Sequence, residues 1–253
     1  MRSAETFVEI APYLVVNLIL FEPDEVNLPL ARTDPRANHI VTVLRRQIGD
    51  VFDAGLINGP RGKGRVEHSD SDVLRLSFVW ETTLPTIDPI TLIVGLPRPQ
   101  TARKILQEAT TLGAAALHFV HCEKTEPGYA ASTLWRDGEW RRHLIAGAEQ
   151  AFTTHLPVVS WDRSLTDVTE ALSETGSRVA LDNYEATASL ADIPFELPPT
   201  ILAFGPERGW SATERTLLRA HRFTLAHLGT RVLRTETACV VALSLAKTRL
   251  NLW

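Results

Sequence analysis

The chain has 253 residues, of which 44% are hydrophobic, and its formal net charge at pH 7 is -4. This length favours two domains with buried cores, and the negative charge argues against indiscriminate binding to nucleic acid. The two cysteines, Cys122 and Cys239, can form at most one disulfide, which argues against a disulfide-rich secreted scaffold and is typical of a reducing cytosol.

The first residues carry no recognisable targeting signal. The apolar run 11–21 is interrupted by Pro12 and Asn17 and is too short to span a membrane. Glu5 and Glu9 lie where a signal peptide would be positively charged, and no small-residue cleavage site follows. We therefore expect a soluble, cytoplasmic protein without a membrane partner.

The segment before residue 85 is predicted to be rich in β-strands. Its predicted elements are a strand over 15–21, a short helix over 35–45 that begins near Asp34, and strands over 51–57, 64–68 and 73–80. Ile40, Val43 and Leu44 are the apolar positions of the helix, and Asn58-Gly59-Pro60 predicts a turn. Between residues 36 and 65, six basic residues outnumber two acidic ones, so this part is positively charged although the whole chain is not.

Pro85 to Pro89 is the best candidate for a linker, and we place the domain boundary there. Beyond it, predicted strands over 90–95, 116–120, 158–161, 178–181, 201–204 and 223–228 alternate with predicted helices over 101–112, 134–151, 165–174 and 236–251. Ser211 and Glu214 form a capping-box pattern that predicts one further helix. The alternation predicts an α/β domain with a mostly parallel sheet covered by helices on both faces. The last helix is apolar on nearly every side, so we expect it to be buried within the domain or against a partner.

Two glycine-containing junctions follow predicted strands and lead into helices. They read Phe-Gly-Pro-Glu-Arg-Gly-Trp over 204–210 and Leu-Gly-Thr-Arg-Val-Leu-Arg-Thr-Glu-Thr-Ala over 228–238. Ligands of open α/β sheets bind beyond the carboxyl ends of the strands, so the two junctions together predict one ligand crevice. Either one alone is also consistent with an ordinary connection. The glycine patterns typical of P-loops and of dinucleotide-binding folds are absent.

The two junctions closely resemble the signature of the ribosomal RNA small subunit methyltransferase E family, a member of the SPOUT superfamily. Weaker matches are Asn38-His39-Ile40, Val43-Leu44-Arg45, Gly49-Asp50, Thr110-Thr111-Leu112-Gly113 and Glu149-Gln150. The resemblance covers residues 17–253 and leaves 1–16 as an N-terminal extension without an assigned role.

This resemblance implies a fold, a cofactor and a reaction. Residues 17–84 are expected to form a small PUA-like β-barrel domain that binds RNA, and residues 90–253 a SPOUT α/β methyltransferase domain with a trefoil knot. The expected partners are S-adenosyl-L-methionine, 16S rRNA or the assembled small ribosomal subunit, and a second copy of the chain in a homodimer. The implied reaction is methylation of N3 of a specific uridine.

The resemblance also implies the residues of the site. Residues expected to hold the cofactor are Leu181, Asp182, Ala203, Phe204, Gly205, Pro206, Glu207, Gly209, Leu228, Gly229, Val232, Leu233 and Thr237. Arg234 and Arg231 are expected to stabilise the negative charge that develops on uracil, with Glu207 and Glu236 orienting donors or accepting a proton. In the alternative interpretation, Arg234 and Glu236 stabilise the loop as an ion pair.

Arg61, Lys63 and Arg65, in the sequence Arg-Gly-Lys-Gly-Arg, are interpreted as a turn that clamps an RNA phosphate, with glycines that allow close backbone approach. The alternative is a solvated hairpin tip. His39 and Arg45 are further RNA candidates, although His39 could instead cap or pack its helix. No metal is expected, because residues 118 and 121 face opposite sides of a strand and no second ligand cluster has zinc spacing.

Several positions depart from the family pattern. Arg208 stands where the family has glycine, Glu108 and Thr111 replace Lys and Glu, and Phe152-Thr153 replaces Gly-Arg. The arginine usual near the first strand is also missing. These departures leave two alternatives open, namely another SPOUT reaction, such as ribose 2′-O-methylation, or a noncatalytic RNA-binding assembly factor.

Overall fold

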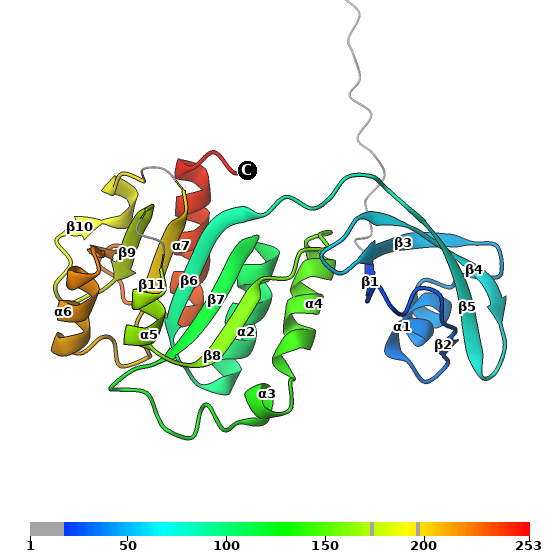
Figure 1. Ribbon diagram of the computed structural model, residues 1–253, viewed down its shortest axis with the longest axis horizontal. Coiled ribbons are helices and arrows are strands. Elements are labelled where there is room, and N and C mark those ends of the chain that lie inside the picture. The colour runs from blue at the N-terminus through cyan, green and yellow to red at the C-terminus, as the bar shows by residue number, and fades with distance from the viewer. Residues whose placement is uncertain (1–17, 173–174, 196–197) are drawn as a thin grey trace, which may run out of the picture.

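The computed structural model describes residues 18–172, 175–195 and 198–253, which form one five-stranded and one seven-stranded sheet (Figure 1). The expected extension 1–16, the start of the predicted strand 15–21 and the end of the predicted helix 165–174 lie outside the described residues. In the part of the chain that is described, no helix combines the length and the apolar character needed to cross a bilayer.

The five-stranded sheet has the strand order β1-β3-β4-β5-β2. Its strands are β1 (Ile19–Phe21), β2 (Leu30–Ala31), β3 (Val51–Leu56), β4 (Arg61–Ser69) and β5 (Val73–Trp80). β1 runs parallel to β3, and the other neighbours are antiparallel. Phe21, Phe52, Val66 and Leu74 point into a small core that Ile40 also joins. The predicted strands of this half are therefore present, and only the two-residue β2 was not predicted.

The predicted helix 35–45 is two short pieces. The α-helix α1 (Pro35–Asn38) begins where the Asp34 side chain accepts a hydrogen bond from the backbone N–H of Arg36 (2.8 Å), and a π-helical turn continues over 39–43. The turn ends because Arg45 adopts a left-handed backbone with φ of 54°. Ile40 is fully buried whereas Val43 is 60% exposed, so Val43 is not a core position as the apolar pattern suggested.

The seven-stranded sheet has the order β10-β12-β9-β11-β6-β7-β8, and every recorded pair of neighbours is parallel. Its strands are β6 (Asp88–Gly95), β7 (Ala114–His121), β8 (Val158–Ser164), β9 (Ser177–Leu181), β10 (Ala188–Ser189), β11 (Thr200–Phe204) and β12 (Thr224–His227). The predicted parallel α/β sheet is thereby confirmed. β6 begins at Asp88, inside the segment that was predicted to be a linker.

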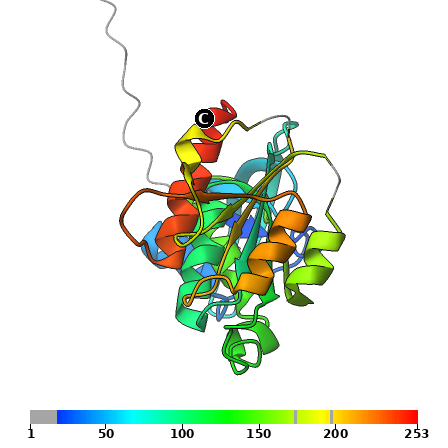
Figure 2. The same ribbon diagram turned by 90° about the vertical axis from the view of Figure 1, so that its left-hand side faces the viewer.

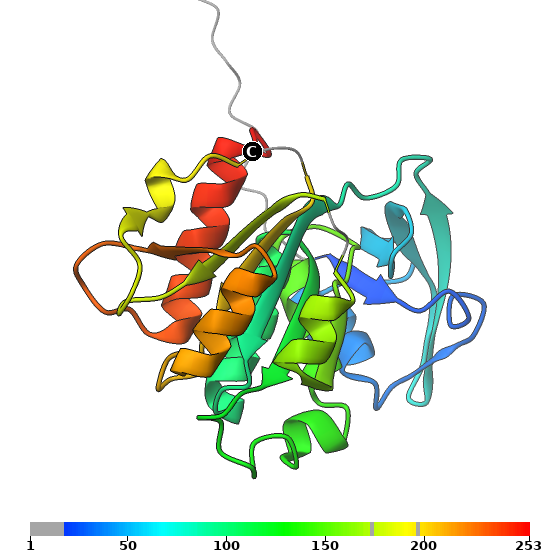
Figure 3. The same cartoon turned by 60° about the vertical axis from the view of Figure 1, so that its left-hand side comes forward.

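Helices cover both faces of this sheet, as predicted. They are α2 (Pro99–Thr111), α3 (Thr133–Arg136), α4 (Trp140–Gln150), α5 (Leu165–Glu170), α6 (Ala212–Ala220) and α7 (Thr235–Arg249). Figures 2 and 3 show α2 and α7 on one side and α5 and α6 on the other. Alternate residues of one strand serve the two sides: Leu92 and Val94 pack with α2 and α7, whereas Ile93 packs with α5 and α6.

The single helix predicted over 134–151 is wrong. Gly138 has φ of +71°, a left-handed conformation that ends α3, and the chain starts again as α4 at Trp140. Leu134 and Leu144 are both buried, so the apolar spacing looked continuous although the backbone is not.

The two sheets share a core. Leu18, Leu20 and Ile57 belong to the same buried cluster as the helices of the larger sheet. The backbone N–H of Leu20 donates to the Glu149 carboxylate on α4 (3.2 Å), and burial raises the pKa of that carboxyl despite this hydrogen bond. On the other side of the junction, the Asn58 N–H donates to the Thr154 carbonyl (2.8 Å). These contacts fix the small sheet against α4.

Candidate functional site

A pocket opens at the carboxyl ends of β9, β11 and β12, the three strands that lie side by side in the sheet. It is lined by Leu181, Asp182, Asn183, Tyr184, Phe204, Gly205, Pro206, Glu207, Arg208, Gly209, Trp210, Leu228, Arg231, Val232, Leu233, Thr235 and Ala238. Both glycine-containing junctions therefore meet at one crevice, as the sequence predicted. The segment after β9 adds a third wall.

The loop 205–210, which follows β11, turns so tightly that it leaves no room for a side chain at residue 205. A Cβ on Gly205 would lie 2.9 Å from the backbone N of Trp210, and Gly209 has φ of +67°. The Gly209 N–H donates to the Pro206 carbonyl (2.7 Å), which closes the turn. The result is a rigid loop that presents backbone atoms to the pocket.

Trp210 and Ser211 fix the exit of this loop. The Trp210 side chain is fully buried, and its indole N–H donates to the Leu181 carbonyl (3.0 Å) at the end of β9. Ser211 N–H donates to the Glu214 carboxylate (2.7 Å), while Glu214 N–H donates to the Ser211 hydroxyl (3.1 Å). The predicted capping box is confirmed, and it starts α6 directly after the loop.

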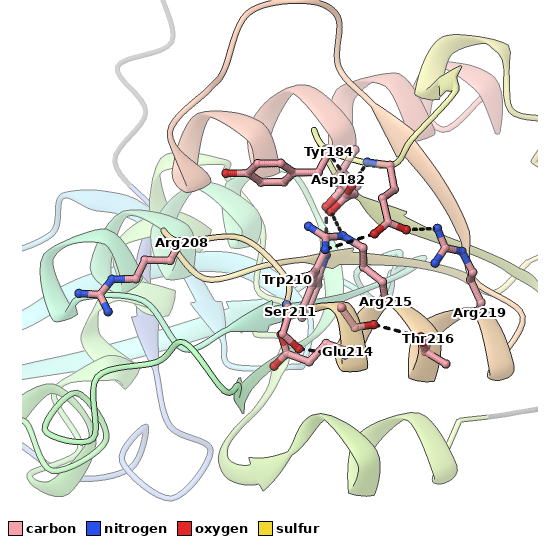
Figure 4. A network of polar contacts seen from close by, with 12 residues as sticks. Asp182, Tyr184, Arg208, Trp210, Ser211, Glu214, Arg215, Thr216 and Arg219 are labelled. Carbon is pink, nitrogen blue, oxygen red and sulfur yellow. Dashed lines mark hydrogen bonds and ion pairs between the residues drawn. The ribbon is translucent and has the colours of Figure 1, made fainter.

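Asp182 is the centre of a charged network beneath the pocket (Figure 4). Its carboxylate accepts hydrogen bonds from the backbone N–H groups of Tyr184 (2.9 Å) and Glu185 (2.6 Å) and from Arg215 Nε (2.7 Å). Burial acts to raise its pKa, but these hydrogen bonds outweigh burial and hold the pKa below its usual value. Arg215 and Arg219 both reach Glu185, at 3.5 and 2.5 Å. The Asp182 carboxylate therefore shapes the loop after β9.

The segment 228–234 runs irregularly from β12 to α7. Gly229 has φ of +104°, which turns the chain, and Arg231 and Val232 are exposed at the mouth of the pocket. Arg234 is the N-cap residue of α7, but its side chain makes no capping hydrogen bond. Its side chain is exposed, and its charge contributes to lowering the pKa of Glu236.

A second, charged cleft adjoins the pocket between the N-terminal ends of α2 and α7. It is lined by Arg98, Gln100, Thr101, Lys104, Glu207, Val232, Leu233, Arg234, Thr235 and Glu236. Glu207 accepts from the Arg98 backbone N–H (2.9 Å) and pairs with Arg98 Nε (3.5 Å). Glu236 pairs with Lys104 (3.2 Å). Glu207, Val232, Leu233 and Thr235 line both hollows, so the two lie next to each other.

The ionisation of Glu236 follows from these neighbours. Burial acts to raise its pKa, but its own backbone N–H, the Lys104 ammonium and the Arg234 charge outweigh burial and lower the pKa. Glu236 is thus ionised at neutral pH. The ion pair that the structure shows for it is with Lys104, while Arg234 acts as a nearby charge.

Most of the predicted site residues meet here. Of those expected to hold the cofactor, the ones that line the pocket are Leu181, Asp182, Phe204, Gly205, Pro206, Glu207, Gly209, Leu228, Val232 and Leu233. Ala203 is buried in the core behind the pocket, and Gly229 lines a neighbouring hollow. Thr237 lines neither the pocket nor the cleft. Of the expected catalytic residues, Arg231 lines the pocket, Arg234 and Glu236 line the cleft, and Glu207 lines both.

Several lining residues were not named from the sequence. Asn183 and Tyr184 follow β9, and Arg98 and Lys104 come from the start of α2. The rule that ligands bind at the carboxyl edge of a parallel sheet would have indicated the first pair, since they directly follow the strand end.

The predicted phosphate-clamp turn is a strand. Arg61, Lys63 and Arg65 lie at the start of β4, which begins three residues earlier than predicted. Their side chains are on the exposed face of the strand, whereas Gly62 and Gly64, which alternate with them, are buried. The glycines serve packing, because a Cβ on Gly62 would collide with the Val79 carbonyl and one on Gly64 with the Phe52 ring. The two glycines are therefore explained by packing within the sheet, a role that the sequence interpretation did not include.

Each cation on this strand already has a neighbour. Arg61 donates to the Phe152 carbonyl (3.3 Å) and its guanidinium lies 5.3 Å from the centre of the Phe152 ring. Lys63 pairs with Asp53 (2.5 Å), and Arg65 Nε donates to the Gly49 carbonyl (3.0 Å). The three side chains still lie on one exposed face.

His39 and Arg45 lie at the two ends of the π-helical turn, far from β4 in sequence. His39 is half-buried and its backbone carbonyl accepts from Leu44, whereas Arg45 is exposed.

Comparison with known proteins identifies the family. The model of the RNA methyltransferase domain matches residues 84–247. The chain is 32% identical to the ribosomal RNA small subunit methyltransferase E of Treponema pallidum, over 94% of this chain and 93% of that protein. It is 25% identical to the ribosomal RNA small subunit methyltransferase E 1 of Borreliella burgdorferi, over 90% of this chain and 95% of that protein. This chain belongs to the ribosomal RNA small subunit methyltransferase E family.

Several solved structures have the same fold as this chain. One is a ribosomal RNA small subunit methyltransferase E from Neisseria gonorrhoeae bound to S-adenosyl methionine, with a TM-score of 0.77 and 23% identity over 94% of this chain and 98% of that one. Another is a probable rRNA-methyltransferase from Porphyromonas gingivalis, with a TM-score of 0.78 and 20% identity over 92% of this chain and 98% of that one. At these identities, the likeness concerns the fold.

The departures from the family pattern have local explanations. Arg208 pairs with Glu126 (3.1 Å), and Figure 4 shows its side chain pointing away from the Asp182 network. Thr111 donates to the carbonyls of Gln107 (3.0 Å) and Gly147 (3.1 Å), which joins α2 to α4. Glu108 is exposed on α2, and nothing in the structure explains its charge.

Proposed function

We propose that this protein transfers a methyl group from S-adenosyl-L-methionine to N3 of a specific uridine in 16S rRNA. The observation that supports this most strongly is that a pocket lined by both glycine-containing junctions adjoins a cleft that carries Arg234. A cofactor in the pocket and an acceptor base in the cleft would then be neighbours. Membership of the family supports the choice of substrate.

The residues of the pocket fit this cofactor. Leu181, Leu228 and Leu233 supply apolar surface for a purine, and the loop 205–209 supplies backbone groups at a place where Gly205 excludes a side chain. Glu207 supplies a negative charge beside the pocket, which suits a cationic ligand. The cofactor brings a methyl group activated by the positive charge of its sulfur. We propose that these residues hold it.

The chain's own part in the reaction is to place the base and to manage charge. Loss of the N3 proton develops negative charge on the uracil ring, and the exposed guanidiniums of Arg234 and Arg231 are available to stabilise it. Glu236 has a lowered pKa and forms an ion pair with Lys104, so we propose that its carboxylate orients the cationic donors of the cleft. Glu207 borders both hollows, and we assign it the acceptance of the proton.

We further propose that residues 17–84 are a PUA-like RNA-binding domain and that residues 90–253 are a SPOUT domain with a trefoil knot, in a cytoplasmic homodimer. The exposed cations of β4 support the first assignment, and the parallel sheet with its site at one edge supports the second. Val240 and Val241 on α7 are half-buried and lie outside the described core clusters, which supports a partner on that helix.

The cofactor assignment is tested by titration of the purified protein with S-adenosyl-L-methionine, followed by transfer of its labelled methyl group to small ribosomal subunits and to free 16S rRNA. We expect saturable binding and one labelled uridine per rRNA molecule. Binding without transfer to either substrate would contradict the enzymatic proposal, and the absence of binding would favour the noncatalytic assembly factor.

A further inference from the structure

The segment 122–126, which follows β7, contacts the loop 205–210. Lys124 Nζ donates to two backbone carbonyls of this loop, those of Arg208 (3.3 Å) and Trp210 (2.9 Å). No other side chain of the described residues is recorded as donating to these two carbonyls. Lys124 is half-buried, and these two hydrogen bonds hold its ammonium against the loop.

The same segment is also joined to the start of α6. The Glu123 N–H donates to one carboxylate oxygen of Glu214 (2.8 Å), whose other oxygen accepts from Ser211. The turn itself is closed by Thr125, whose N–H donates to the Cys122 carbonyl (3.0 Å) and whose hydroxyl accepts from the Cys122 N–H (3.3 Å). Lys124 thus projects from a short turn that is fixed at both ends.

We propose that Lys124 is a positioning residue for the cofactor, acting through the backbone of the loop 205–210. This inference rests on the proposed function, because it requires that the loop contacts S-adenosyl-L-methionine. A carbonyl that accepts from the ammonium fixes its peptide plane, and the N–H of that same peptide is fixed with it. By holding the carbonyls of residues 208 and 210, Lys124 orients the peptides that lead into Gly209 and Ser211.

Charge strengthens this effect. Hydrogen bonds from an ammonium to carbonyls are stronger than neutral ones. Without the Lys124 ammonium, the carbonyls of residues 208 and 210 lose this hydrogen-bond donor. The loop 205–210 then gains conformational freedom, which it must lose again when a ligand binds. The cost should therefore appear in cofactor affinity more than in the rate of the chemical step.

A second contact between the same two segments serves as a matched control. Arg208 pairs with Glu126 at 3.1 Å, but the two side chains are 70% and 49% exposed. An ion pair this exposed contributes little, because water screens it and both side chains lose freedom. Glu126→Gln removes a link between the same segments without touching Lys124.

The experiment compares the full-length wild type with Lys124→Met, Lys124→Arg and Glu126→Gln, by titration with S-adenosyl-L-methionine and by steady-state methyl transfer. We expect Lys124→Met to raise the dissociation constant and the KM for the cofactor about tenfold. Its kcat at saturating cofactor should stay within about twofold, since the loop is ordered once the ligand is bound. Lys124→Arg should restore most of the affinity, and Glu126→Gln should change it by less than about twofold.

Unchanged affinity in Lys124→Met, or a loss of kcat with unchanged KM, would overturn the positioning role. If Lys124→Met does not fold, Lys124→Gln replaces it, because the neutral amide of glutamine can still donate a hydrogen bond. This variant should give an intermediate loss of cofactor affinity. Wild-type affinity in Lys124→Gln would also overturn the positioning role. Failure of the wild type itself to bind the cofactor would instead count against the proposed function, so the two failures are distinguishable.

Discussion

Asp182 and Arg215 form a charged pair that is almost completely withdrawn from water, with side chains 1% and 9% exposed. Resemblance to the family implies that Asp182 is a cofactor residue. The structure shows that its two oxygens already accept three hydrogen bonds from the protein. The residue therefore supports the wall of the pocket, and its removal should be felt first in stability.

Asp182→Asn should lower the free energy of unfolding at pH 7 by about 3 kcal/mol, because it leaves the buried Arg215 with only the more exposed Glu185, at 3.5 Å, as a counter-charge. The pKa of Asp182 is lowered in the folded protein, so its stabilisation is complete above the unfolded-state pKa of about 3.9 and is lost as the pH falls below that value. The difference from the wild type, measured by urea denaturation, should stay constant from neutral pH down to about pH 5 and shrink below about pH 4.

Glu185→Gln is the control for this prediction, since Glu185 contacts the same Arg215 but is 41% exposed, and it should cost less than about 1 kcal/mol. A cost for Asp182→Asn no larger than that of the control would show that the buried pair does not stabilise the fold.

Arg234→Ala should lower kcat for methyl transfer about 100-fold, the size expected when one charge-stabilising donor is removed. Cofactor affinity and the free energy of unfolding should change little, because the Arg234 side chain is exposed and makes no capping hydrogen bond. Arg249→Ala, at the other end of α7, is the control. Methyl transfer by Arg234→Ala at the wild-type rate would remove the catalytic assignment of Arg234. It would favour the interpretation that Arg234 only interacts with the charge of Glu236 in the loop.

At the scale of elements, most strands of the larger sheet were predictable because they contain a short apolar run, as β11 does. β2 and β10 were not, since two residues carry no periodicity. The break between α3 and α4 depends on the conformation of one residue, Gly138, which the apolar spacing does not report. Glycine also misled the prediction at β4, where Gly62 and Gly64 were interpreted as turn residues but leave room for Val79 of β5 and Phe52 of β3.

Because Arg61, Lys63 and Arg65 share one exposed face of β4, their joint replacement by alanine should weaken rRNA binding and lower the slope of log affinity against log salt by about 2. Fluorescence anisotropy with 16S rRNA fragments over a salt series measures this slope. The Arg249→Ala protein should keep the wild-type slope. An unchanged slope in the triple variant would mean that these side chains, each already paired within the protein, serve only the fold.

At the scale of the whole molecule, the site is assembled from segments that are far apart in sequence. The two signature junctions could be paired from the sequence because their composition is unusual and their order matches a known family. The contribution of α2, with Arg98 and Lys104, could not, because it depends on how that helix packs beside α7. The position of the small sheet depends likewise on Leu18, Leu20 and Ile57, which join the larger core.

The atom that is methylated is measured most directly by nucleoside analysis of 16S rRNA from cells with and without this protein. We expect one N3-methyluridine to disappear when the protein is absent, to return with the wild-type chain and not to return with Arg234→Ala. A full complement of N3-methyluridine in cells without the protein, or the loss of a ribose methyl group in its place, would contradict this expectation.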